Sequence, residues 1–230
     1  MVVDDAWVRR PRQARSQETL DRFLTATEQL LAERPFEDIT VADIVARAGR
    51  TVGSFYARFD DKDSVLLCLV ARLDERARQV TRAFCDPVRW EGATVAEFVA
   101  ESVRLNVAAY RRAGPLFRAA LIASTTDDRF RTARRDTLRA CAEAQKAFLV
   151  TRVDELGCAF PDRASDRAFE LVTARLDHEL LFGRLTATSP VGDAELAAEL
   201  VEQCRAVLGI VDPEADRAPE GVVGAGVDPD

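Results

Sequence analysis

Residues 39–66, ITVADIVARAGRTVGSFYARFDDKDSVL, decide the interpretation of the whole chain. Thr40 fits the N-cap of a short helix, and Asp43 stands three residues on, where its carboxylate can reach back to the cap. Gly49 stands where that helix needs a residue free to adopt positive φ. Thr51 fits the cap of a second short helix. The spacing predicts two short helices joined by a tight turn, which is the helix-turn-helix arrangement.

The second short helix carries two kinds of side chain. Val52, Phe55 and Phe59 are the apolar residues that we expect to face inward. The remaining side chains are small or form hydrogen bonds, and such groups suit phosphates and base edges in a major groove. They are Arg50, Thr51, Gly53, Ser54, Tyr56 and Arg58. Double-stranded DNA is therefore the partner that this helix predicts.

Several of these residues also have a purely structural interpretation. Tyr56 either packs in the core or uses its hydroxyl on a phosphate. Lys62, in the first turn of a third helix capped by Asp61, is either a solvated lysine or a phosphate clamp aided by the helix N-terminus. Thr51 and Ser54 either read DNA or only cap their helix, and Arg50 and Arg58 are either DNA contacts or plain surface residues. Thr40 caps its helix, which is compatible with a phosphate contact from the same helix end.

The segment AGRTVGSFYARFDDKDSVL, residues 48–66, resembles the TetR family of bacterial transcriptional regulators. The likeness covers roughly residues 16–70, and Tyr56, Phe59 and Lys62 make it specific. Arg50 departs from it, since the family usually has an apolar residue there, and so does Pro35, where Gly is usual. With the resemblance, the expected DNA contacts are Thr40, Arg50, Thr51, Val52, Gly53, Ser54, Tyr56, Arg58, Lys62, Arg12 and Arg15. The resemblance also implies a homodimer and an inducer pocket in the helical body.

Composition and charge limit the class of protein. With 230 residues, 47% apolar and 31% charged, the sequence is that of an ordinary globular protein. The net charge of −7 argues against a general nucleic-acid coat, so any DNA contact must be local. Residues 1–15 hold such a local patch, with no acid between Ala6 and Gln17. This segment is either a disordered tail or an arm that follows phosphates or enters the minor groove; its arginines are Arg9, Arg10, Arg12 and Arg15.

No sequence feature indicates a membrane protein, a metal site or an enzyme. No apolar run approaches the ~18 to 20 residues of a membrane span, and the N-terminus lacks the apolar core of a signal peptide. The five cysteines are scattered, which predicts reduced thiols in a cytoplasmic protein. His178 is the single histidine, and Phe182 occupies the second histidine position of an HExxH motif. We therefore expect no cofactor, no metal and no catalytic residues.

Hydrophobic periodicity predicts an all-α chain of about nine helices. The first begins at its cap Ser16, ends before Pro35 and has an apolar face of five residues, Leu20, Phe23, Leu24, Leu30 and Leu31. The fourth runs from Asp61 to about Phe84, and the seventh ends at Gly157. The eighth runs from Pro161 to about Leu185. We expect a flexible basic arm at residues 1–15, a DNA-binding domain at 16–60, a helical regulatory and dimerisation domain at 61–210 and a disordered tail at 211–230.

The eighth helix is apolar on more than one side, with residues such as Phe169 on one side and Leu171 elsewhere. It is either the central helix of one body or part of a four-helix bundle made by the last two helices of two subunits. Such a dimer would place two heads about one DNA turn apart, ~34–36 Å, on a palindromic operator.

The candidate effector pocket draws on apolar residues of the fifth to eighth helices, although aromatic residues at helical spacing also suit an ordinary core. The candidates are Phe98, Ser102, Leu105, Phe117, Leu121, Phe130, Phe148 and His178; His178 alternatively serves as a hydrogen-bonded structural histidine. Two functions follow: a homodimeric repressor released by a small hydrophobic or aromatic effector, or the same DNA-binding fold acting constitutively or through a protein partner.

Overall fold

The computed structural model describes residues 14–183 and 192–210. Within these residues the chain forms nine α-helices, three short 3-10 helices and no strand, which confirms the predicted all-α class. The α-helices are α1 Ala14–Glu33, α2 Val41–Ala48, α3 Val52–Tyr56, α4 Lys62–Phe84, α5 Val95–Arg112, α6 Gly114–Ser124, α7 Asp128–Val150, α8 Pro161–Phe182 and α9 Asp193–Leu208. The 3-10 helices are η1 Phe36–Asp38, η2 Pro87–Trp90 and η3 Val153–Glu155.

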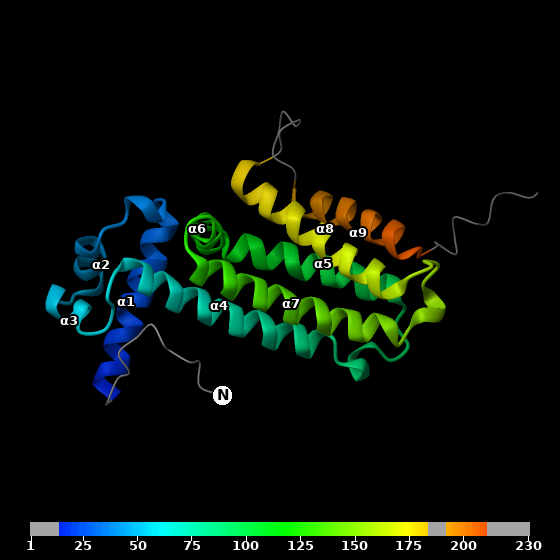
Figure 1. Cartoon of the computed structure of the whole chain (residues 1–230), viewed down its shortest axis with the longest axis horizontal. Coiled ribbons are helices and arrows are strands. Elements are labelled where there is room, and N and C mark those ends of the chain that lie inside the picture. The colour runs from blue at the N-terminus through cyan, green and yellow to red at the C-terminus, as the bar shows by residue number, and fades with distance from the viewer. Residues whose placement is uncertain (1–13, 184–191, 211–230) are drawn as a thin grey trace, which may run out of the picture.

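The helices form a small head and an elongated body (Figure 1). In the head, α1, α2 and α3 gather at one end of the molecule, and α4 runs from them along the length of the body. In the view of Figure 1, α4 follows the lower edge of the body and α9 the upper edge, with α5 and α7 between them. None of the described helices is long and apolar enough to cross a membrane.

The caps predicted for the head are confirmed. The Thr40 hydroxyl accepts from the Asp43 backbone N–H at 3.2 Å, and the Asp43 carboxylate accepts from the Thr40 N–H at 2.9 Å, which completes a capping box. Gly49 ends α2 with a φ of 62°, in the left-handed region that favours glycine. Thr51 caps α3, and the Asp61 carboxylate caps α4 by accepting from the Ser64 N–H at 2.7 Å.

Three helix ends differ from the predictions. Helix α1 begins at Ala14, two residues before the predicted cap Ser16. Helix α7 ends at Val150 and not at Gly157, because Arg152 turns away to donate to the Trp90 carbonyl at 2.8 Å. Helix α8 ends at Phe182, and the predicted end near residue 185 lies outside the described residues, as do residues 1–13 and the predicted tail at 211–230.

Two hydrophobic cores hold the molecule. The first joins the head to the start of α4, to α6 and to Phe130, and its centre is the fully buried trio Phe23, Phe55 and Phe59. The second fills the body between α5, α7, α8 and α9. All five predicted apolar residues of the first helix are buried, and all five cysteines are free, four of them buried. Through the first core, the head contacts the start of α4, α6 and the start of α7.

Candidate functional site

The exposed side of α3 contains most of the predicted DNA contacts. Thr51, Val52, Gly53 and Tyr56 are exposed, with Val52 at 50% and Tyr56 at 48% of their possible surface. Tyr56 packs the edge of its ring against Phe55, with the centroids 5.4 Å apart. A short rigid helix thus presents a tyrosine hydroxyl, a threonine and a glycine to the outside.

Val52 does not face the core, so the expectation that it points inward is wrong. The ring of Phe23 on α1 covers Phe55, with centroids 5.4 Å apart. Val52 lies about one turn earlier on α3, about 4.5 Å along the helix axis, and is not among the buried residues of the core. Its exposure agrees with its place among the predicted DNA contacts.

Arg50 lies half-buried in the turn between α2 and α3. One guanidinium nitrogen lies 3.6 Å from the Glu18 carboxylate of α1, and another donates to the Gly49 carbonyl at 3.3 Å. Glu18 is also paired with Arg22 at 2.9 Å. Because Glu18 is exposed and shared, its pairing with Arg50 contributes about 0–1 kcal/mol.

Lys62 has a structural role that neither sequence interpretation included. Its ammonium donates to the carbonyl oxygens of Phe36 at 3.0 Å, Glu37 at 3.3 Å and Ile39 at 2.9 Å. It also lies 4.7 Å from the centre of the Phe36 ring. An ammonium has three donors, and all three are engaged. Lys62 therefore joins the start of α4 to η1, and its contact with a DNA phosphate stays a prediction.

Three of the predicted DNA contacts already make hydrogen bonds within the head. The Thr40 hydroxyl donates to Asp43 at 2.6 Å, and these bonds together with Arg34 lower the pKa of Asp43 to about 2. One Arg58 nitrogen donates to the Ser54 carbonyl at 3.1 Å, and the Ser54 hydroxyl donates to the Thr51 carbonyl at 2.7 Å.

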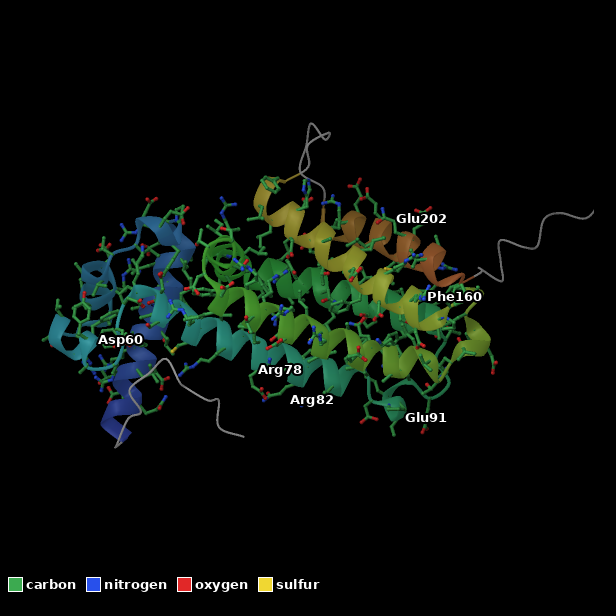
Figure 2. All side chains as sticks on the ribbon, viewed as in Figure 1. Asp60, Arg78, Arg82, Glu91, Phe160 and Glu202 are labelled. Atoms are coloured by element: carbon green, nitrogen blue, oxygen red, sulfur yellow. The ribbon has the colours of Figure 1, made fainter. Side chains whose placement is uncertain are left out.

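Two acidic residues follow α3, and two predicted DNA contacts have side chains outside the described part of the chain. Asp60 lies in the turn between α3 and α4 (Figure 2), and Asp61 follows it. Arg15 lies in the first turn of α1, but its side chain is outside the described part of the chain, and so is all of Arg12.

The body contains a cavity of about 250 Å³ between α4, α5, α6, α7 and α8. Of the predicted pocket residues, only Leu105 and Phe117 line it. Phe98 and Phe148 instead stack on each other in the body core, with centroids 4.2 Å apart. Phe130 is buried in the first core, because it lies at the end of α7 nearest the head.

The remaining three predicted pocket residues also lie elsewhere. Ser102 lines a separate void of about 30 Å³. Leu121 is not among the residues that line the cavity. His178 is half-buried on α8 and contacts the Phe182 ring, with centroids 5.3 Å apart.

A polar network that the sequence did not reveal borders this cavity. The Tyr110 hydroxyl donates to the Asp177 carboxylate at 2.8 Å, and Arg134 pairs with the same carboxylate and donates to the Tyr110 oxygen at 3.3 Å. Burial raises the pKa of Tyr110 to about 12. The three side chains come from α5, α7 and α8, so only the packing of the helices brings them together.

Asp74 of α4 also lines the cavity. Burial raises the pKa of its carboxyl to about 6, against a hydrogen bond from Thr137 and nearby Arg78 and Arg134, which lower it. The Thr137 hydroxyl in turn accepts from Arg78 at 2.7 Å. A carboxylate in a mainly apolar cavity is the kind of perturbed group that marks a ligand site.

Comparisons with known proteins agree with this architecture. Residues 23–69 match the family model described as bacterial regulatory proteins, tetR family. A TetR-family transcriptional regulator of Mesorhizobium loti has a similar structure, with 14% identity, a TM-score of 0.68 and coverage of 86% of this chain and 98% of that one. No curated protein matches the sequence significantly.

Two further structures share the fold. GusR of Salmonella enterica is 18% identical with a TM-score of 0.63, and the likeness covers 83% of this chain and 95% of that one. A TetR-family regulator of Rhodococcus sp. is 16% identical with a TM-score of 0.62, over 83% of this chain and 99% of that one. The N-terminal domain of this chain is thus a TetR-family DNA-binding helix-turn-helix domain, and the chain as a whole has the fold of the TetR-family transcriptional regulators.

Proposed function

We propose that this protein is a homodimeric transcriptional repressor, active in the cytoplasm, that binds a palindromic operator and is released by a small molecule bound in its body. The observation that carries the proposal is the exposed face of α3, where Tyr56 stands outside a core that already contains Phe23, Phe55 and Phe59. The Tyr56 ring packs against Phe55, and its hydroxyl makes no hydrogen bond to any residue that the structure describes, which suits a phosphate contact.

Gly53 supports DNA as the partner by a different argument. A Cβ built on Gly53 would meet no atom within 4 Å, and its φ is not in the positive region, so nothing in the described part of the chain requires glycine there. Glycine within a helix costs roughly 0.5–1 kcal/mol relative to alanine. The close approach of an external surface, such as the wall of a DNA groove, explains why the small residue stands there.

Tyr56→Phe is the first test of the DNA-binding surface. We expect DNA beside the protein's own gene to bind about five- to tenfold more weakly, because one hydrogen bond contributes roughly 1 kcal/mol or somewhat more when it reaches a charged group. Gel-shift titrations at several salt concentrations measure the loss, and thermal unfolding shows whether stability is unchanged. Equal affinity of both proteins at every salt concentration would remove Tyr56 from the interface.

Gly53→Ala is expected to change stability and DNA binding in opposite directions. The head should gain roughly 0.5–1 kcal/mol from the better helix former, while affinity for the same DNA falls about tenfold or more because a methyl group enters the interface. Thermal unfolding measures the first effect, and the same gel-shift titration measures the second. Unchanged DNA affinity in Gly53→Ala would contradict the proposed approach of DNA to α3.

The surface of α8 and α9 supports the proposed dimer. Phe182, at the end of α8, is 67% exposed. A groove of about 800 Å³ lies between α5 and α9, with Ala197, Ala198 and Val201 among its apolar lining residues. A four-helix bundle of α8 and α9 from two subunits would bury such surface. The gel shift of a palindromic fragment should therefore show two copies of the chain per site.

The alternative function has no small-molecule effector, and the protein then represses constitutively or through a protein partner. The cavity beside Asp74 favours the ligand-responsive form, because unfilled cavities cost stability and this one carries a charged group. A ligand that binds the body can release DNA only if it favours one arrangement of the two heads over another. The contact of α6 and α4 with the head offers a route for that coupling.

A further inference from the structure

The chemistry of the cavity indicates which class of effector it takes. Its wall is largely apolar, with Leu73, Val80, Leu105, Phe117 and Leu138 among the lining residues. Its volume of about 250 Å³ lies slightly below the range of about 300–1,000 Å³ typical of ligand pockets. The cavity therefore suits a compact apolar body, about as large as one aromatic ring with a short chain.

Most of the buried charges at this cavity already have partners. Arg134 is only 17% exposed, and its charge is balanced by Asp177, to which Tyr110 also donates. Arg78 pairs with Glu75 at 3.4 Å and reaches the Thr137 hydroxyl. A ligand could therefore bind either arginine only if that arginine lost its existing ion pair.

Asp74 differs from these groups. In the described part of the chain, none of the ion pairs includes Asp74, and its hydrogen-bond partner is the neutral Thr137 hydroxyl. Arg78 and Arg134 are near enough to influence it but are paired with other carboxylates. A carboxylate in this position gains most from a positively charged donor, since interactions between charges are strengthened in a low-dielectric interior.

We propose that the cavity takes a compact apolar molecule with one cationic nitrogen, and that Asp74 binds this nitrogen. The inference rests on the proposed effector-binding function of the body and specifies the class of effector. Arg76 and Arg112 also line the cavity and are exposed, which would instead suit an anion at its mouth. Solvent and salt screen those two arginines, whereas Asp74 is shielded, so the buried charge decides the preference.

Matched probes test the assignment on the full-length protein. The probes are 4-phenylbutylamine, 4-phenylbutan-1-ol and 4-phenylbutanoic acid, which share a skeleton and differ in the terminal group. Two further amines, 3-phenylpropylamine and 2-phenylethylamine, have chains that are shorter by one and two carbons. We expect calorimetry at pH 7.5 to show that an amine binds at least about tenfold more tightly than the alcohol, and that the acid binds most weakly.

Two variants with the same loss of charge locate the effect. In Asp74→Asn, the amine should lose its advantage and bind about as well as the alcohol. Asp154→Asn should keep the full advantage, because Asp154 is an exposed residue of η3 that does not line the cavity. Burial raises the pKa of Asp74, so its charge disfavours the folded state at pH 7.5, and the Asn variant is not expected to be less stable.

Each other outcome overturns the assignment. Preference for the acid would mean that the arginines at the mouth choose the ligand. Equal binding of the three probes would mean that shape alone selects it, and an amine advantage that survives in Asp74→Asn would place the cation elsewhere. The effector class would be refuted if no amine bound to a protein that still binds the DNA beside its own gene in a gel shift. The DNA-binding function would then remain intact.

Discussion

Phe55→Ala should unfold the head and abolish DNA binding. Phe55 is fully buried and its ring lies 5.4 Å from that of Phe23 and 5.2 Å from that of Phe59, centre to centre. Truncation of a buried phenylalanine costs about 3–5 kcal/mol, through the lost burial and the cavity left behind. Phe55 is the only buried residue of α3, so its truncation leaves that helix without a side chain in the core. Operator affinity should fall below detection in a gel shift.

Circular dichroism during urea unfolding separates loss of the head from loss of the whole fold. The body has its own core, centred on residues such as Phe98 and Leu200, so most of the helical signal should persist in Phe55→Ala. Tyr56→Ala is the matched control, because the neighbouring ring is half exposed and its removal should leave the unfolding curve nearly unchanged. If Phe55→Ala bound DNA as the parent protein does, the three-phenylalanine core would not be what supports α3.

Arg134→Met is expected to destabilise the body by about 3–5 kcal/mol. Among the described residues, the substitution leaves the half-buried Asp177 carboxylate with only the Tyr110 hydroxyl as a donor, and loss of one partner from a buried pair has a cost of this size. Arg104→Met is the control, since the pair of Arg104 with Glu101 is exposed and should contribute less than about 1 kcal/mol. Urea unfolding measures both losses.

A double-mutant cycle checks that Arg134 and Asp177 act as a pair. Arg134→Met combined with Asp177→Asn should recover much of the lost stability, because no unpaired charge then remains. The coupling energy from the cycle should amount to roughly 0.5–3 kcal/mol. Additive effects of the two substitutions would mean that each side chain contributes separately, and that the network does not join α7 to α8.

The local sequence was sufficient to predict features that depend on residues a few positions apart. The Thr40–Asp43 capping box, the left-handed Gly49 and the Asp61 cap are all within one helical turn, and the structure confirms each of them. The same applies to the apolar face of the first helix. The helix-turn-helix could be predicted because its geometry follows from spacing, and the residues between its caps can form little else.

Only the tertiary structure shows which residues of other elements the long side chains contact. Lys62 is bound to carbonyls 23 to 26 residues earlier in the chain, and the sequence gives no sign of that contact. Val52 resembles a core residue because it is apolar, but as the first residue of α3 it is half exposed.

The cavity also could not be predicted from the sequence. Periodicity identifies which side of a helix is apolar, and it correctly placed Phe98, Phe148 and Phe130 inside the molecule. It cannot tell which apolar sides pack closely and which leave a space, since that depends on the angles and distances between helices. Tyr110, Arg134 and Asp177 meet only because α5, α7 and α8 converge, so both the network and the charge of Asp74 at the cavity wall are properties of the packed structure.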